Sequence, residues 1–219
     1  MKKYELLVED TITFFGVQLF RIKALISFSG IEKGEVGGYI ASEKNLSQSG
    51  NAWVYGNARV YGNARVYGDA WVSGNARVSG NARVYGNARV SGDAWVSGNA
   101  RVSGNARVSG NAWVSGNARV SGNAEVYGNA EVYGNAEVYG DAEVYGNADY
   151  IVFKNTWSSG RYFTYTKSNK KWRVGCFYGN GYELIEKAYK DSQKSGDFYK
   201  AYVEFVEKLE EIEKIHKGQ

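Results

Sequence analysis

The sequence predicts a mainly β fold, a long coil of short parallel strands, followed by a smaller mixed domain. The main observation is a repeat: from Gly50 to Asp149 the chain reads Gly-(Asn/Asp)-Ala-x-Val-(Tyr/Ser) in 17 consecutive units without an insertion. Proline is absent, and the glycines of the repeat recur every six residues. Since 43% of the 219 residues are hydrophobic, the chain can bury a real core, and we expect it to be ordered.

Each unit has the chemistry of one short strand and one corner. Alternate residues of a strand point to opposite faces, so Val points one way and its two neighbours point the other way. Gly followed by Asn or Asp is turn chemistry, because these residues tolerate positive φ. The third residue is Ala in every unit, from Ala52 to Ala148. We expect Val and Ala inside the coil, with Ala at a corner where there is little room.

The residues before Gly50 fit a degenerate first coil and a cap. In the register of the repeat, Val36 occupies a Val position, whereas Ile40 and Leu46 occupy Ala positions. Larger residues there predict a coil that closes the end, because solenoids need caps. Residues 4–24 read as a strand and hairpin that cover this end.

The pattern stops after Asp149 and predicts an α+β domain. Three strands with turns between them, and then two helices, are expected over residues 150–153, 161–165, 171–177, 183–192 and 197 to about 217. The sequence is therefore divided into an N-terminal β cap (1–31), a repeat coil (32–149) and a C-terminal three-strand, two-helix domain (150–219).

The repeat resembles the hexapeptide repeat of left-handed parallel β-helices, in which Val is followed four residues later by a small residue. The resemblance implies three hexads for each triangular coil of 18 residues. With the cap motifs Gly37-Gly38-Tyr39-Ile40 and Asn45-Leu46-Ser47, the chain looks like the hexapeptide-repeat proteins of bacterial genomes, phages and prophages. The segment Gly175 to Gly179 before a helix is similar to a small domain seen in phage proteins.

An 18-residue coil would stack the fourth positions of the units into three outward columns. The first is Trp53, Trp71, Arg89, Arg107, Glu125 and Glu143; the second is Arg59, Arg77, Trp95, Trp113, Glu131 and Asp149; the third is Arg65, Arg83, Arg101, Arg119 and Glu137. The tryptophans fall into two pairs, and the arginines precede the acids along the axis. Tyr and Ser at the sixth position would leave shallow troughs beside the long side chains.

Two interpretations of these columns stay open. In the first, the columns have no binding role: duplication of the hexad leaves ladders of like residues behind, and the stacked aromatic rings protect the surface. Alternatively, Trp, Tyr and Arg are enriched at binding hot spots, and here they would lie on a preorganised surface. On this second hypothesis the partner-binding residues are Trp53, Trp71, Trp95, Trp113, Arg59, Arg77, Arg83, Arg89, Arg101, Arg107 and Arg119.

Catalysis is not expected. The resemblance includes acyltransferases that use a histidine base and a loop extruded from a coil, but the only histidine here is His216, outside an uninterrupted repeat. Cys176 is the only cysteine, so no internal disulfide forms, and we expect it to be buried in a strand. Asp69, Asp93 and Asp141 fit turn positions and lie too far apart to share a metal. We therefore expect no cofactor and no metal.

The expected partner is a protein or an anionic small molecule. Stacked arginines repel one another, which favours an acidic partner. Nucleic acid is less favoured, because the net charge is only +4 and acidic columns share the coil. No apolar run is long enough to span a membrane, and we expect a cytoplasmic protein. The resemblance to phage proteins implies an inhibitor of a host defence factor; the alternative is a self-associating, homo-oligomeric rod.

Overall fold

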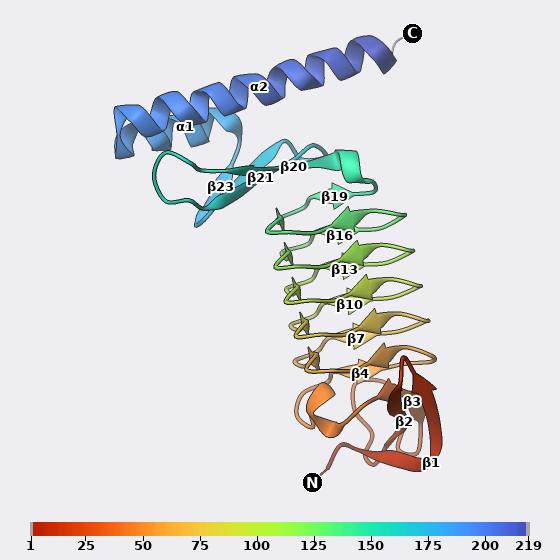
Figure 1. Ribbon diagram of the computed structural model, residues 1–219. Helices are drawn as coiled ribbons and strands as arrows, with labels where there is room; N and C mark the ends of the chain where they lie inside the picture. Colours follow the sequence, from red (N-terminus) through yellow and green to blue (C-terminus); the bar gives the residue numbers. More distant parts are fainter. Residues whose placement is uncertain (1, 218–219) are drawn as a thin grey trace. The chain divides into compact units, whose positions relative to one another are not determined.

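A computed structural model describes residues 2–217 (Figure 1). The ends of the predicted cap and C-terminal domain, Met1 and residues 218–219, lie outside the described residues. The chain forms two compact units, Met1–Tyr150 and Ile151–Gln219.

The first unit is a parallel β-solenoid, which confirms the predicted fold class. Its two-residue strands are β4 (Trp53–Val54), β5 (Arg59–Val60), β6 (Arg65–Val66), β7 (Trp71–Val72), β8 (Arg77–Val78), β9 (Arg83–Val84), β10 (Arg89–Val90), β11 (Trp95–Val96), β12 (Arg101–Val102), β13 (Arg107–Val108), β14 (Trp113–Val114), β15 (Arg119–Val120), β16 (Glu125–Val126), β17 (Glu131–Val132), β18 (Glu137–Val138) and β19 (Glu143–Val144). Figure 1 shows the coils stacked along one axis.

Every third strand pairs in parallel with a strand 18 residues away. Arg89 pairs with Trp71 on one side and with Arg107 on the other. The three sheets run β19-β16-β13-β10-β7-β4, β17-β14-β11-β8-β5 and β18-β15-β12-β9-β6, and β3, β2 and β1 extend the second of them. Each coil therefore contains three hexads, as the repeat predicts.

The interior consists of two residue types. Val54 to Val144 and Ala52 to Ala142 at the repeat positions are no more than 1% exposed. Gly98 shows why the corners need glycine: its φ is +64°, and a Cβ there would lie 3.0 Å from the backbone nitrogen and oxygen of Gly116 in the next coil. The last unit departs from the pattern, because Ala148 lies in a 3-10 turn (η2, Asn147–Asp149) and is exposed rather than buried.

The second residue of each unit forms a hydrogen-bonded ladder along the corners. Asn81 Nδ2 donates to Asn99 Oδ1 at 3.0 Å, one coil further on. Where Asp replaces Asn, it accepts in the same way: Asn75 Nδ2 donates to Asp93 Oδ1 at 3.0 Å. The aspartates thus have the turn role expected from the sequence.

The N-terminal cap is a three-stranded extension of the second sheet. It contains β1 (Tyr4–Phe14), β2 (Val17–Ala24) and β3 (Val36–Ile40), and the first two form the expected hairpin. β3 pairs in parallel with β5, and the turn η1 (Glu43–Asn45) follows it.

The predicted register of the first coil is wrong by two residues. Ile40 pairs with Val60, and Leu46 bridges to Val66, so both occupy Val positions rather than Ala positions, while Val36 pairs with Lys23 of β2 and is exposed. The offset is 20 residues instead of 18. The extra two residues lie in the corner between Leu46 and Val54, which includes the residues just before the first repeat unit at Gly50.

Side chains of the cap satisfy the backbone at the open end of the solenoid. Within the stack, amide N–H groups donate to carbonyls one coil further on, as Trp95 N does to Ala112 O. In the first repeat coil, the carbonyls of Ala58, Val60 and Val66 accept in this way from Tyr39, Ala41 and Ser47, whereas other carbonyls of that coil accept from side chains. Lys3 Nζ donates to Gly50 O and Ala52 O, Arg21 Nη1 to Gly56 O, and Asn45 Nδ2 to Gly62 O and Ala64 O.

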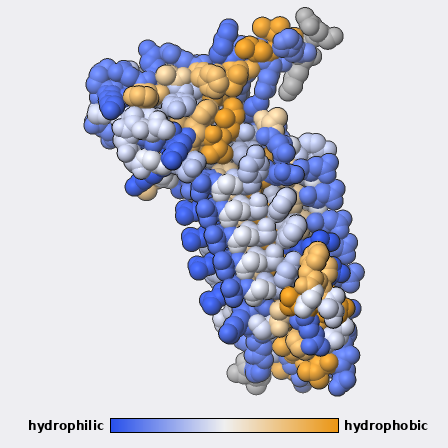
Figure 2. All heavy atoms as spheres, in the orientation of Figure 1, coloured by the Kyte–Doolittle hydropathy of each residue, from blue (hydrophilic) through white to orange (hydrophobic). Residues whose placement is uncertain are grey.

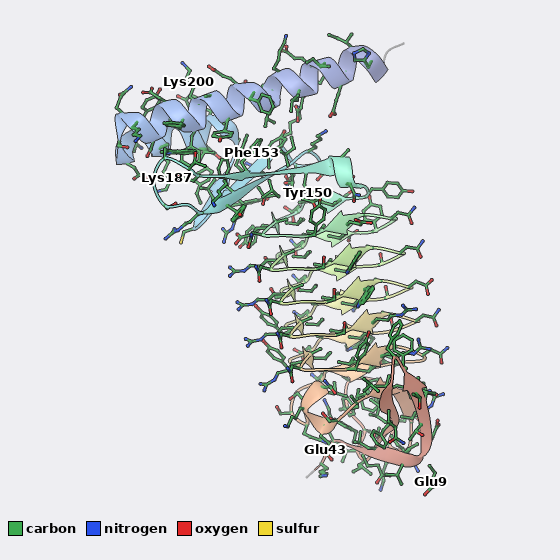
Figure 3. The ribbon with its side chains drawn as sticks, viewed as in Figure 1. Glu9, Glu43, Tyr150, Phe153, Lys187 and Lys200 are labelled. Carbon is green, nitrogen blue, oxygen red and sulfur yellow. The ribbon has the colours of Figure 1, made fainter. Side chains whose placement is uncertain are left out.

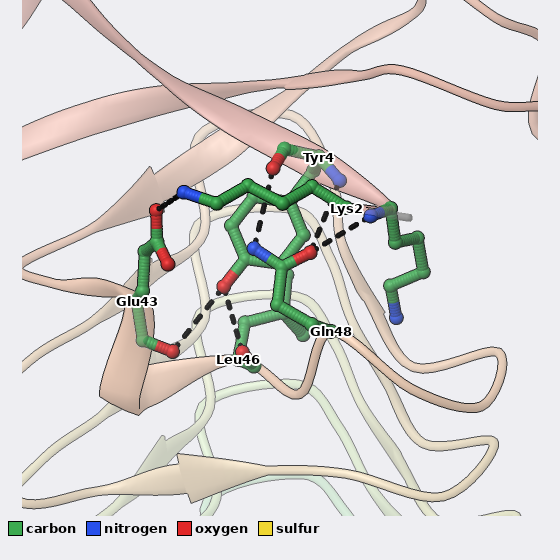
Figure 4. A network of polar contacts seen from close by, with 6 residues as sticks. Lys2, Tyr4, Glu43, Leu46 and Gln48 are labelled. Atoms are coloured by element: carbon green, nitrogen blue, oxygen red, sulfur yellow. Dashed lines mark hydrogen bonds and ion pairs between the residues drawn. The ribbon is translucent and has the colours of Figure 1, made fainter.

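Lys3 is held in place by the polar network drawn in Figure 4. Its backbone N–H donates to Gln48 Oε1, and Tyr4 Oη donates to the carbonyl of Leu46 at 2.7 Å. Lys3 is 2% exposed, and this burial lowers the pKa of its ammonium to about 8, although the charge of Asp69 acts in the opposite direction. Lys2, by contrast, is exposed and pairs with Glu43 at 2.7 Å.

Acceptors close the other end of the solenoid. Asn147 Oδ1 accepts from Glu131 N at 2.7 Å, and Asp149 Oδ2 accepts from Tyr145 N and Gly146 N. The expectation that Asp149 belongs to the second outward column is therefore wrong, because its carboxylate turns back to cap the backbone of its own turn.

The second unit is an antiparallel sheet with two helices, as predicted in outline. Its elements are β20 (Tyr150–Lys154), β21 (Tyr162–Thr166), β22 (Lys171–Val174), β23 (Phe177–Gly179), α1 (Gly181–Asp191) and α2 (Gln193–Lys217), and the sheet has the order β20-β21-β22-β23. Phe163, Trp172, Leu184 and Val203 are among the residues of its core. Asn180 caps α1, since its side chain accepts from Glu183 N at 2.9 Å.

Three predictions for this unit are wrong. The expected third strand, residues 171–177, is two strands, because Gly175 has a φ of +58° and turns the chain between β22 and β23. Cys176 is exposed at this turn instead of buried in a strand. In addition, α2 begins at Gln193 rather than at residue 197.

Candidate binding surface

The fourth-position side chains project from the solenoid in three columns with the predicted membership, Asp149 excepted. The strand registers place Trp53, Trp71, Arg89, Arg107, Glu125 and Glu143 in the first column, Arg59, Arg77, Trp95, Trp113 and Glu131 in the second, and Arg65, Arg83, Arg101, Arg119 and Glu137 in the third. Figure 3 shows side chains leaving the solenoid in regular layers. Successive members are about 4.8 Å apart along the axis.

Trp53 does not belong to the candidate surface, which corrects the prediction. It is 0% exposed, and its ring packs edge-on against Tyr4 and Phe28, with centroids 6.2 and 5.5 Å away. The physical reason is that the cap covers the first coil on this side. Trp53 therefore anchors the cap and cannot contact a partner.

The remaining side chains of the first column have neighbours of their own. The Trp71 ring lies 5.2 Å from Tyr55 and carries the Arg89 guanidinium 5.3 Å from its centroid. One coil further on, Arg107 Nη1 lies 3.1 Å from Glu125 Oε1. Both exposed arginines of this column are thus matched to a ring or a carboxylate.

The arginines of the second column lie under the cap hairpin. The guanidinium groups of Arg59 and Arg77 lie 4.3 and 5.3 Å from the centroid of the Phe14 ring, and both residues are half-buried. Phe14 is therefore part of this surface, and no pattern in the sequence placed it there. These two arginines are therefore less accessible to a partner than the sequence suggested.

Trp95 and Trp113 form a stacked pair whose ring orientations are fixed by hydrogen bonds. Their rings stack at 5.2 Å with an interplanar angle of 9°. The indole N–H of Trp95 donates to Ser79 Oγ at 3.1 Å, and that of Trp113 donates to Ser97 Oγ at 3.0 Å. Ser at the sixth position hence has two effects: it leaves room for the indole and fixes its orientation. Trp113 remains 39% exposed.

The third column is the most cationic part of the surface. Arg65, Arg83, Arg101 and Arg119 are all exposed. Arg119 Nη1 lies 3.5 Å from Glu137 Oε1, whereas no ion pair or ring contact joins the other three to any residue within 2–217. Beside them, Tyr67 and Tyr85 stack at 5.0 Å with an interplanar angle of 1°. In Figure 2, blue hydrophilic rows run along the solenoid next to paler ones.

A hollow of about 450 Å³ opens where the third column meets the cap. It is lined by Glu43, Lys44, Leu46, Ser47, Gln48, Arg65, Val66, Tyr67 and Arg83. We call it the N-terminal hollow. Arg65 and Lys44 were not among the residues predicted to bind a partner: the sequence placed Arg65 in the third column, but the position of Lys44 depends on the shifted register of the first coil.

Sequence comparison agrees with this geometry. Residues 58–74, 70–83, 82–98, 100–116 and 112–128 match the family model described as YdcK Beta solenoid repeat. The chain is a β-helix repeat protein. A search of curated proteins found no significant match.

None of the helices within the residues that the structure describes combines the length and the apolar character that crossing a membrane requires. Within the same residues, no group of three or more His, Cys, Asp or Glu side chains could hold a metal ion.

Proposed function

We propose that this chain is a non-catalytic binding protein whose solenoid presents its outward Trp, Arg and Tyr side chains to a partner. The observation that carries the proposal is the Trp95–Trp113 stack, in which both indole N–H groups are held by serines and one ring is well exposed. Large aromatic groups are the side chains most often found at the energetic centre of an interface.

The solenoid supports this proposal through preorganisation. Ladder hydrogen bonds fix the backbone on both sides of each tryptophan: Trp95 N donates to Ala112 O, and Ser97 N donates to Val114 O, both at 2.9 Å. A side chain that is already ordered loses little conformational entropy when it binds. The stacked rings are consequently suited to a rigid, flat contact.

The partner in this proposal is a host protein, with an anionic small molecule as the alternative. The resemblance of the repeat, the cap and the Gly175–Gly179 segment to phage and prophage proteins supports a phage-encoded inhibitor of a host defence factor, acting in the host cytoplasm. Exposed arginines in the same coils as the tryptophans favour an acidic surface on that partner.

The proposal is tested by comparing captured proteins between variants. The immobilised chain, the double variant Trp95→Ala/Trp113→Ala and the control Tyr182→Ser are incubated with bacterial lysate, and the bound proteins are identified by mass spectrometry. Tyr182 is 70% exposed and lies on α1, outside the solenoid, so its replacement should leave the solenoid and its outward side chains intact. We expect a protein that binds the wild type and the control but not the double variant. Equal capture by all three would contradict the role of the stack.

A second candidate function, self-association, is favoured by an apolar stripe on α2. Phe205, Ile212 and Ile215 are 51%, 42% and 62% exposed, and the first two are seven residues apart on the same side of the helix. Figure 2 shows orange hydrophobic side chains at the surface of this unit. A second copy of α2 could cover the stripe. In the solenoid, basic and acidic coils could also pair between antiparallel copies.

Sedimentation distinguishes these two modes of association. A dimer held by charges should dissociate as salt is added, because exposed ion pairs are screened. A dimer held by α2 should persist in salt and be lost in Ile212→Lys. A monomer at all protein and salt concentrations would rule out this second function.

A further inference from the structure

The outward arginines differ in whether a neighbouring side chain of the same protein contacts their guanidinium group. Most have a neighbour that compensates their charge or covers their guanidinium group: Arg59 and Arg77 lie on Phe14, Arg89 lies on Trp71, and Arg107 and Arg119 pair with Glu125 and Glu137. Three do not. Arg65, Arg83 and Arg101, which we call the free arginines, are consecutive members of the third column, and no ion pair or ring contact joins them to another described residue.

This row concentrates positive charge on one side of the solenoid. The parallel register places neighbouring backbone positions about 4.8 Å apart, so the three guanidinium groups repel one another. The ladder hydrogen bonds on either side, such as Arg83 N to Ala100 O at 2.9 Å, keep the backbone from separating them. An anion that bridges the row would relieve this repulsion.

The N-terminal hollow continues the row and adds to its charge. Three of its lining side chains are cationic, Lys44, Arg65 and Arg83, and one is acidic, Glu43. Glu43 is already paired with Lys2 at 2.7 Å, which leaves the cations in excess (Figure 4). The hollow is large enough to accept the end of a chain that runs along the free arginines.

We propose that the free arginines and the N-terminal hollow form a binding site for an extended acidic peptide segment of the partner. This inference rests on the proposed function, and it specifies which face of the solenoid binds the partner and which kind of segment of the partner binds there. Glutamate or aspartate carboxylates bind along the row, where each guanidinium can donate two parallel hydrogen bonds to a carboxylate. A carboxylate at the end of the segment lies in the hollow.

The spacing of the row suits an extended peptide. Such a peptide points alternate side chains to the same face about 6.8 Å apart, and the row from Arg65 to Arg101 spans about 9.6 Å. The coils are about 4.8 Å apart and the peptide carboxylates about 6.8 Å apart. The long arginine side chains are able to bend across this difference. A short acidic stretch with two or three carboxylates on one face therefore fills the row.

The surroundings of the row favour a peptide over nucleic acid. Binding of single strands combines a cationic groove with aromatic rings on which the bases stack. Here Tyr67 and Tyr85 stack on each other at 5.0 Å, which leaves no slot between them for a base. In addition, the column ends in Glu137, and the neighbouring columns carry Glu125 and Glu131 in the same coil, all of which repel a phosphate chain that continues along the axis.

A symmetric pair of chains does not fit this face. The third column contains one acid, Glu137, and Arg119 already pairs with it. Two copies joined through their third columns would bring arginines against arginines. We therefore assign the acidic segment to a different molecule; pairing of the row with the acidic coil of a second copy would instead appear as the salt-dependent dimer in sedimentation.

The test measures binding of a fluorescently labelled oligoglutamate to the full chain by fluorescence anisotropy at low salt. The variant Arg83→Gln/Arg101→Gln removes two free arginines, and Lys187→Gln/Lys200→Gln removes the same charge from exposed positions of the second unit. We expect oligoglutamate to bind the wild type about tenfold more tightly than the arginine variant. The lysine variant should match the wild type. Circular dichroism confirms that each variant is folded.

Several results would overturn the proposal. They are no binding of oligoglutamate, an equal loss of affinity in both variants, or tighter binding of an oligothymidylate that depends on the same arginines. The last result would assign the row to nucleic acid. A failure here is distinguishable from failure of the proposed function, because protein capture that depends on Trp95 and Trp113 is a separate measurement on a different face.

Discussion

The inside and the outside of the solenoid arise from the same six-residue unit but follow different rules. Inside, Val and Ala repeat without change through coil after coil and are almost completely buried. Outside, the fourth position varies among Trp, Arg and Glu from one strand to the next. The fold needs the constant positions, while the variable ones leave the backbone unaltered. The outward side chains can therefore vary without a change of fold, which the proposed binding role requires.

The largest expected effect on stability comes from replacing an inward residue, and it should exceed the effect of replacing the outward residue beside it. Val102 is fully buried and Arg101 is exposed. Val102→Asp would bury an unpaired carboxylate, so we expect the free energy of unfolding to fall by about 3 kcal/mol or more. Arg101→Ser should change it by roughly 0.5 kcal/mol or less. Urea titrations of the two variants check this, and similar losses would abolish the distinction between inside and outside.

A smaller contrast is expected between two neighbouring lysines of the cap. Lys3 is buried and donates to two carbonyls of the first coil, whereas Lys2 forms an exposed ion pair. Lys3→Met leaves those carbonyls without their donor and should cost about 1–3 kcal/mol. Lys2→Met should cost at most about 1 kcal/mol. Thermal unfolding of both variants tests the idea that cap side chains stabilise the open end of the solenoid.

Lys3 also predicts a pH dependence. Burial lowers the pKa of its ammonium from 10.5 to about 8, so above pH 8 the folded state releases this proton before the unfolded state does. The free energy of unfolding should therefore gain a contribution that rises with pH between about 8 and 10. Above that range Tyr4, whose pKa is raised by burial, acts in the opposite direction. Stability measured against pH should lose this rise in Lys3→Met; an unchanged rise would exclude Lys3 as its source.

The smallest predicted effect concerns two outward arginines, whose replacement should change the free energy of unfolding in opposite directions. Arg83 has only like-charged neighbours in its column, so Arg83→Gln should stabilise the solenoid at low salt by roughly 0.3 kcal/mol. Arg107 pairs with Glu125, so Arg107→Gln should destabilise it by a similar amount. Both effects should vanish at high salt. Equal signs at low salt would mean that the two columns do not differ electrostatically.

The period of the repeat was sufficient to predict most of the solenoid. A unit of six residues and a coil of 18 fixed which residues stack, and the column memberships followed without further information. The period does not predict the two ends of the solenoid, where the repeat begins and stops. Two extra residues before Val54 shifted Ile40 and Leu46 into Val positions, and Asn147 and Asp149 cap the last coil instead of continuing it.

Which outward residues are accessible could not be predicted from the repeat. Trp53 and Trp71 occupy the same position of the unit, yet only Trp53 lies under the cap. Likewise, the free arginines differ from Arg59 because Phe14 reaches that residue from a hairpin some 45 residues earlier in the sequence. One missed feature did carry a signal: Gly175, in the middle of the expected third strand, marks the turn between β22 and β23.

In the proposed site, the third column holds arginines that are free to bind an acidic segment. Nuclear magnetic resonance of the arginine Nε–Hε groups during titration with oligoglutamate observes this binding residue by residue. We predict that the signals of Arg65, Arg83 and Arg101 shift together and saturate, while those of Arg89 and Arg107 stay in place. Uniform shifts of all outward arginines, or shifts confined to Arg89 and Arg107, would contradict the claim.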